Sequence, residues 1–425
     1  MNYSGSALYG ASLYGGAVTL MTYGSGLYGT FLYGGTVPPD GGVVVTPVPA
    51  GTAYPGSVSG GLLTVQVIYK LADRDNTHRK DISGVMTAGE VAVDMSQPSP
   101  MTFTGETIRA GELTPYRDWI APIVRLSWAE GSATFVMEEQ VGLFCVMPPN
   151  KRYTAAGGTE TIEGRDPTWL LQQAKVATPY AVPGGQNVGN AIESLCSQVG
   201  ARHAIQTTTQ TMPRRRTWKA GTSKLDIAND LARAIGFLSL YPDRIGRIRS
   251  RRSQRLGNVV PARTISSVAG HVVETVTMEP DLTRLVNHVV VVGNDARDNP
   301  VEAERLNDDP SSPTSTVSLG GGRDSPIVYF RLIELTDETT QDAVDQMADR
   351  IMDQGSSVFV RTSLTTLPII DWDLHEVVRL DVATDGGEVV AAGIHRWDTL
   401  RMSLGVNMTS QWRLNKLTRW SKVTA

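Results

Sequence analysis

The sequence predicts a mainly β protein with an α/β insert: two barrel-like β domains on either side of a middle α/β domain, preceded by an extended arm. Alternating apolar and polar residues recur in short runs from Leu62 onward, and again in the last quarter of the chain. After Asp166 the apolar spacing changes to three or four residues, which is typical of helices. The high content of 42 glycines and 23 prolines favours turn-rich β architecture.

Residues 1–60 form the predicted arm, and Asp40 is their only charged residue. The stretch ALYGASLYGG returns as GLYGTFLYGG nineteen residues later, with seven of ten letters unchanged. So many glycines make ordering costly, so we expect the arm to become ordered by lying on another surface. Tyrosine anchors beside glycine suit a clamp on a neighbouring subunit. The alternatives are receptor or sugar contact and plain disorder. The candidate intersubunit contacts are Leu8, Tyr9, Leu13, Tyr14, Leu27, Tyr28, Leu32 and Tyr33.

Residues 61–165 are predicted to form the first barrel-like β domain. The runs LLTVQVIYKL, EVAVDM, MTFTGETIRA, IVRLSWAE, ATFVMEEQVGLFCVM and TETIEG each alternate with period two and are separated by turn signals. This spacing of strands and turns is typical of an antiparallel sandwich or barrel.

Residues 166–275 are predicted to form the middle α/β domain. A short helix covers Pro167–Val176, and a second begins at an Asn187 cap and is closed by Gly200. A third runs through TSKLDIANDLARAIG and stops at Gly236. The segment FLSLYPDRIGRIRS that follows is expected to form a strand, a turn and a second strand.

Residues 276–425 are predicted to form the second barrel-like β domain with one helix. The strand patterns RLVNHVVVVGN and SPIVYFRLIEL enclose a segment, residues 294–325, whose hydrophilic composition predicts a polar surface loop. A helix is expected from about Asp337 to Asp353, and the runs SVFVRTSLTTL, HEVVRLDV, EVVAAGIHRWD and MSLGVNMTSQWRLN are expected to be strands.

Composition and spacing indicate no catalytic, cofactor-binding or metal-binding residues. The six histidines stand singly, and Cys145 and Cys196 are about 50 residues apart, so we expect both cysteines to be small buried hydrophobes. The GxGxxG at Gly24 falls inside the repeat, without a strand before it or a helix after it. A net charge of -4 argues against a general binder of nucleic acid or membrane surfaces, and no apolar run approaches the ~20 residues of a membrane span.

One segment of the chain is strongly basic. Between Arg202 and Arg255 there are thirteen lysines and arginines against three acidic residues. This asymmetry fits a docking face for an acidic neighbour or a symmetry mate, nucleic acid, or simply a solvated strand face. The candidate docking residues are Arg214, Arg215, Arg216, Arg244, Arg247, Arg249, Arg251 and Arg252.

Several short sequence segments occur in an order that is similar to that found in one protein family. They are TPYRDW, VGLFCVMPP, IEGRDPTWLL, WKAGTSKLDI, IGFLSLYPDRIGRIR and EPDLTRLVNHVVVVG. Together they resemble the tail-tip (baseplate) hub proteins of long-tailed phages, the minor tail proteins of actinobacterial viruses, over roughly residues 62–425.

The resemblance implies a structural virion protein at the tail tip, with no enzymatic activity and no cofactor. Its two barrel-like domains would be of the tail-tube type, and a homotrimer would mimic a six-fold ring. The implied partners are the distal tail protein, the tape measure protein and the central fibre or other minor tail proteins. DNA would pass without specific binding. A tail-tip adhesin for host glycans and a cell-wall hydrolase are the alternative functions.

Overall fold

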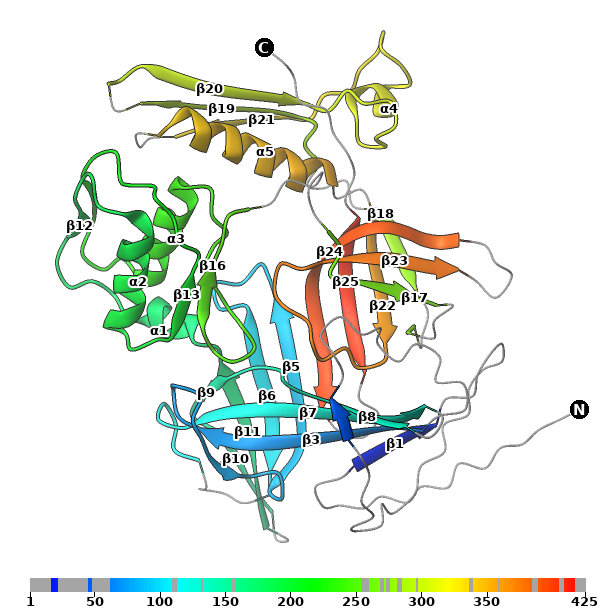
Figure 1. Ribbon diagram of the computed structural model, residues 1–425. Coiled ribbons are helices and arrows are strands. Elements are labelled where there is room, and N and C mark those ends of the chain that lie inside the picture. Colours follow the sequence, from blue (N-terminus) through cyan, green and yellow to red (C-terminus); the bar gives the residue numbers. More distant parts are fainter. Residues whose placement is uncertain are drawn as a thin grey trace, which may run out of the picture.

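The computed structural model describes fifteen stretches of the chain. They are residues 17–21, 45–47, 62–108, 113–130, 133–154, 157–253, 260–267, 271–272, 276–280, 285–295, 297–335, 339–357, 360–383, 389–404 and 409–416. These residues form four units around two large cores and two smaller ones (Figure 1).

The first β unit spans residues 62–165 and contains nine strands. They are β3 (Leu62–Ala72), β4 (His78–Asp81), β5 (Met86–Asp94), β6 (Met101–Thr107), β7 (Trp119–Glu130), β8 (Ala133–Gln140), β9 (Phe144–Val146), β10 (Asn150–Thr154) and β11 (Gly157–Arg165). All pairings among these strands are antiparallel. Alternate residues of β6 are buried, as the period-two pattern predicts.

Two segments of the predicted arm belong to the sheet of their own chain. Strand β1 (Ala17–Met21) pairs antiparallel with β3, and β2 (Val45–Pro47) pairs parallel with β8. These two segments of the arm therefore donate strands within their own chain, whereas the sequence predicted an arm that is ordered by another surface. The apolar run AVTLM between the two Leu-Tyr-Gly pairs supplies the β-forming residues for β1.

The middle α/β unit spans residues 166–253, and its three helices lie where the sequence predicts them. Its elements are α1 (Thr168–Gln173), β12 (Tyr180–Val182), α2 (Val188–Gln198), β13 (His203–Ile205), β14 (Arg216–Trp218), α3 (Lys224–Ala234), β15 (Tyr241–Pro242) and β16 (Ile248–Ser250). The Asn187 side chain caps α2, and Gly200 and Gly236 follow α2 and α3 with positive φ. These local signals therefore predicted the helices correctly.

A peripheral unit, residues 285–357, stands apart from the large sheet. It consists of β19 (His288–Asn294), β20 (Pro300–Leu306), α4 (Thr316–Gly320), β21 (Phe330–Glu334) and α5 (Gln341–Ser357). The three strands form their own sheet, and α5 lies between that sheet and the rest of the molecule (Figure 1). Val289 and Val291 of the sheet pack on Val344, Ala348 and Met352 of the helix.

The prediction of a loop across residues 294–325 was wrong, because it contains β20 and α4. Buried polar side chains of the peripheral unit hold this segment in place. Asn287 is fully buried, donates to the carbonyls of Thr314 and Ile327, and accepts from the Tyr329 amide. Hydrophilic composition predicted surface exposure, but satisfied hydrogen bonds allow polar groups to be buried.

The C-terminal β unit comprises residues 260–280 and 360–416. Its strands are β17 (Arg263–Ser266), β18 (Thr277–Pro280), β22 (Val360–Thr366), β23 (Val377–Ala383), β24 (Val389–Leu404) and β25 (Ser410–Lys416). Trp372, Trp397 and Trp412 stack edge to face in its core, with ring centroids 5.8 and 5.7 Å apart.

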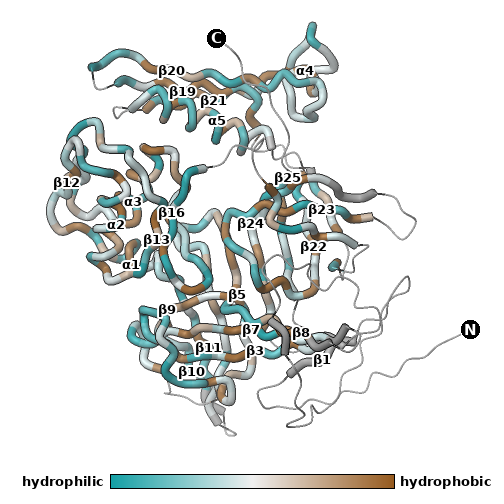
Figure 2. Tube along the Cα trace, viewed as in Figure 1, coloured by the Kyte–Doolittle hydropathy of each residue, from teal (hydrophilic) through white to brown (hydrophobic). Residues whose placement is uncertain are grey.

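Strand β24 joins the two β units into one sheet. Its first half pairs with β23, and residues Thr399–Leu404 pair antiparallel with Gly89–Asp94 of β5. The hydrophobic core is likewise continuous across the joint, where Val91 and Val93 meet Leu400 and Met402 in one cluster. Figure 2 shows apolar residues on the strands that meet there. The two β units are therefore fixed to each other by backbone hydrogen bonds.

Candidate docking surface

The first part of the predicted basic face lies on a loop that backbone hydrogen bonds hold in place. The Met212 amide donates to the Gln186 carbonyl at 2.9 Å, and the Met212 carbonyl accepts from Gly185 at 2.8 Å. A Cβ at Gly184 would lie 3.1 Å from the Arg214 Cα, so glycine permits this close approach. The loop is therefore pre-organised against the turn that precedes α2.

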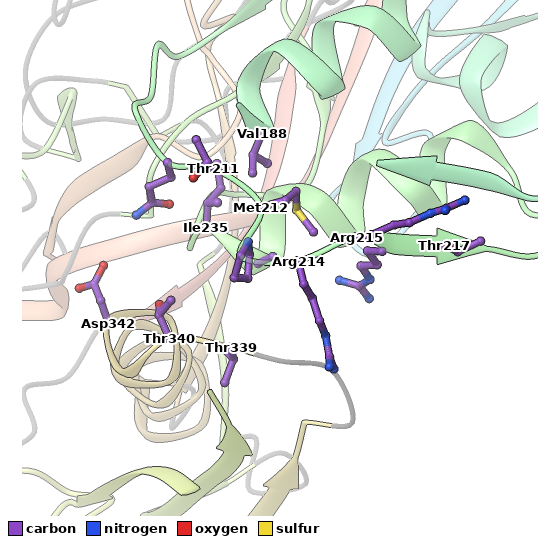
Figure 3. Close-up of a pocket in the computed structure, with 14 residues that line it drawn as sticks. Val188, Thr211, Met212, Arg214, Arg215, Thr217, Ile235, Thr339, Thr340 and Asp342 are labelled. Carbon is purple, nitrogen blue, oxygen red and sulfur yellow. The ribbon is translucent and has the colours of Figure 1, made fainter. Parts of the chain in front are cut away.

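This loop forms one wall of a groove, and the beginning of α5 forms the other (Figure 3). The cavity measures about 700 Å³. Val188, Met212 and Ile235 contribute apolar surface to its lining. Three arginines, Arg214, Arg215 and Arg216, line it together with one acidic residue, Asp342, and we call it the basic groove.

The three arginines of the basic groove have different surroundings. Arg216 lies over the Trp218 ring, 5.1 Å from its centroid, and pairs with Asp230 at 3.6 Å. Arg214 and Arg215 are exposed. Arg216 therefore supports the wall of the groove, while Arg214 and Arg215 line it with exposed side chains.

The other five arginines of the predicted face bond groups of their own chain. Arg249 pairs with Asp373 at 2.9 Å, and Arg251 donates to the His375 carbonyl. Arg247 pairs with Asp243, and the exposed Arg252 lies 3.7 Å from Asp342. The sequence could not reveal this, because most of these acceptors lie about 90 to 125 positions further along the chain.

Arg244 connects three units. Its guanidinium donates to Glu139 of the first β unit at 2.8 Å and to the Ile370 carbonyl of the C-terminal β unit at 3.0 Å. Gln140 in turn donates to the Arg244 carbonyl. Part of the predicted docking face is thus an internal junction between the middle unit and the two β units.

The predicted contacts of the arm lie outside the described residues. These are Leu8, Tyr9, Leu13, Tyr14, Leu27, Tyr28, Leu32 and Tyr33. Their role as intersubunit contacts stays a prediction.

Both cysteines are buried and unsuited to nucleophilic chemistry. Burial raises the pKa of the Cys145 thiol to about 11 and that of the Cys196 thiol to about 12. Within the described stretches, no group of three or more His, Cys, Asp or Glu side chains is placed to hold a metal ion. The helices of these stretches include none long and apolar enough to cross a membrane.

Comparison with known proteins finds similarity in structure but not in sequence. No model of a known protein family and no curated protein matches the chain. The tail protein of Neisseria meningitidis MC58 is 11% identical, with a TM-score of 0.57, over 82% of this chain and 96% of that one. The chain has the fold of a tail protein. The 43 kDa tail protein of prophage MuSo2 from Shewanella oneidensis is similar too, at 12% identity and a TM-score of 0.53 over 82% and 97% of the two chains. The predicted mainly β fold class with an α/β insert is thereby confirmed.

Proposed function

We propose that this chain is a structural protein of a phage virion and forms the hub at the tail tip. The main support is its similarity to two tail proteins, which extends over nearly their whole lengths and over 82% of this chain. In this role it would join the distal tail and the tape measure protein to the central fibre or other minor tail proteins, without catalysing a reaction.

The joint between β5 and β24 suits such a role. A hub must transmit load between the tube above and the fibre below, and a joint made of paired strands resists shear better than two domains on a flexible linker. In a homotrimer, each copy would contribute two β units fixed side by side, so that three copies could match a six-fold tube.

Imaging tests this proposal directly. Antibodies raised against the purified chain should label the distal end of isolated virion tails, and density at that position should contain three copies. Labelling of the capsid or along the tail shaft, or six copies at the tip, would contradict the hub assignment. A zymogram on host cell wall provides the control for the hydrolase alternative, and we expect no lysis band from the purified chain.

A further inference from the structure

The peripheral sheet has one covered face and one open face. Val289 and Val291 of the central strand β19 point to α5. Successive residues alternate in direction, so Val290 and Val292 point the other way, and the strand register places Leu332 beside Val290 and Phe330 beside His288. An apolar row therefore crosses the face that α5 does not cover.

This row continues onto the edge of the sheet. Among the described strands, β21 pairs only with β19. The segment that leads into β21 and the strand itself expose five large apolar side chains, each 42% to 55% accessible. They are Ile327, Val328, Tyr329, Phe330 and Leu332, which we call the apolar edge. Folded monomers normally protect an edge strand with charges, proline or a covering segment, so an exposed edge this apolar indicates an interface.

The charged side chains on the open face of the sheet are acidic, whereas the exposed Arg331 of β21 is in register with Val289 and alternates to the other face. The register places Glu304 opposite Val290, and Glu302 opposite Val292, on the open face. Glu334 lies on the other side of Val292. The open face thus combines apolar side chains with three carboxylates.

The basic groove has the complementary character. Its floor includes Val188, Met212 and Ile235, which are only 1% to 6% exposed, and Arg214 and Arg215 on its wall carry exposed positive charge. The two surfaces differ from each other and belong to the same chain. A contact between two different surfaces of identical copies is head-to-tail, and such contacts build closed rings when the rotation between copies allows it.

We propose that the apolar edge of one copy docks in the basic groove of the next copy. The Tyr329 and Phe330 rings enter beside Arg214 and Arg215, where guanidinium groups stack favourably on aromatic faces. Edge-to-edge pairing of two β21 strands is disfavoured, because it would place the acidic open faces of two sheets side by side and bring like charges together. This inference rests on the proposed ring-forming hub and identifies the contact that would close the ring.

Cysteine cross-linking tests the contact on the full-length chain. Cys145 and Cys196 are buried, so a short bismaleimide should react with cysteines introduced at the surface and leave these two native thiols unmodified. Thr211→Cys places a thiol on the groove and Val328→Cys places one on the apolar edge. We expect a mixture of the two single variants to give covalent dimers, the double variant to give covalent trimers, and each single variant alone to give monomers.

Charge reversal supplies a second measurement. Arg214→Glu with Arg215→Glu, or Glu302→Lys with Glu334→Lys, should each reduce cross-linking at least tenfold, and combining both pairs in one chain should restore it. Lys219→Glu is the matched control, because Lys219 is exposed on the middle unit but does not line the groove. Unchanged circular dichroism would show that the reversed variants fold.

Three results would overturn the inference. They are cross-links from Val328→Cys alone, cross-linking that is undiminished when either charge reversal is made by itself, and no cross-links either at high protein concentration or in assembled tails. In each case antibody labelling and the copy number at the tail tip would still report separately on the proposed function.

Discussion

Replacing Arg305 by methionine should destabilise the peripheral unit more than any other single change of a charged side chain there. Arg305 on β20 is only 3% exposed in its side chain and bonds two aspartates of α5, Asp349 at 2.6 Å and Asp345 at 2.5 Å. Burial disfavours the charge on Arg305, but the bonds to both aspartates outweigh burial and raise its pKa. The three groups form a buried ion cluster between the sheet and its helix.

The expected magnitude follows from burial. The Asp349 side chain is 5% exposed, so Arg305→Met leaves a carboxylate opposite a hydrocarbon, and breaking a buried pair in this way costs about 3–5 kcal/mol. Asp345 is 29% exposed, so solvent screens its pairing, and Asp345→Asn should cost only about 1 kcal/mol. Removing both buried charges, in Arg305→Met with Asp349→Leu, should recover most of the loss.

Hydrogen exchange measures this effect locally. The peripheral unit has its own core, so we expect amides of β19, β20 and α5 to exchange about a hundredfold faster or more in Arg305→Met, while those of β5 and β24 stay protected. Urea unfolding of the three variants gives the corresponding free energies. A loss below about 1 kcal/mol for Arg305→Met, or no recovery in the double variant, would refute this account of the cluster.

Three further predictions concern pH, the arm and the basic groove. Burial and two nearby arginines lower the pKa of His375 from 6.5 to about 3. Between pH 6.5 and 3 the unfolded chain therefore binds more protons than the folded chain, so the free energy of unfolding should fall by up to about 1.4 kcal/mol per pH unit as the pH drops below 6.5. His375→Asn, which tolerates the φ of 62°, should flatten this slope in urea titrations at pH 4 to 7. Deleting residues 1–16 should leave the melting temperature unchanged. Deleting residues 1–36 also removes β1 and should lower the melting temperature. Equal melting temperatures of the two deletion variants would show that β1 adds nothing to stability. Arg214 and Arg215 are too few for strong DNA binding, so the purified chain should bind DNA weakly at physiological salt, and tight saturable binding would contradict the protein-docking role.

The local signals of the middle unit could be read directly from the sequence. Asn187, Ser223 and Gly236 mark helix ends through contacts with residues three to five positions away, so they need no knowledge of the rest of the fold. The strands of the first β unit could also be predicted, because alternation along one strand reflects its own two faces.

Other features depend on partners far along the chain. PVEAERL is too polar to predict a half-buried strand, and it becomes one because Arg305 meets two aspartates about 40 residues later. Arg244 suggested a docking face until the fold supplied Glu139 and the Ile370 carbonyl.

The sequence by itself determined the helices of the middle unit and most strands of the first β unit, since those preferences come from neighbouring residues. Only the tertiary structure decided that β24 pairs with β5, that most of the clustered arginines bond their own chain, and that β21 lies at an exposed edge. Strand register, ion pairing and exposure are all set by which distant surfaces meet, and no local pattern specifies that.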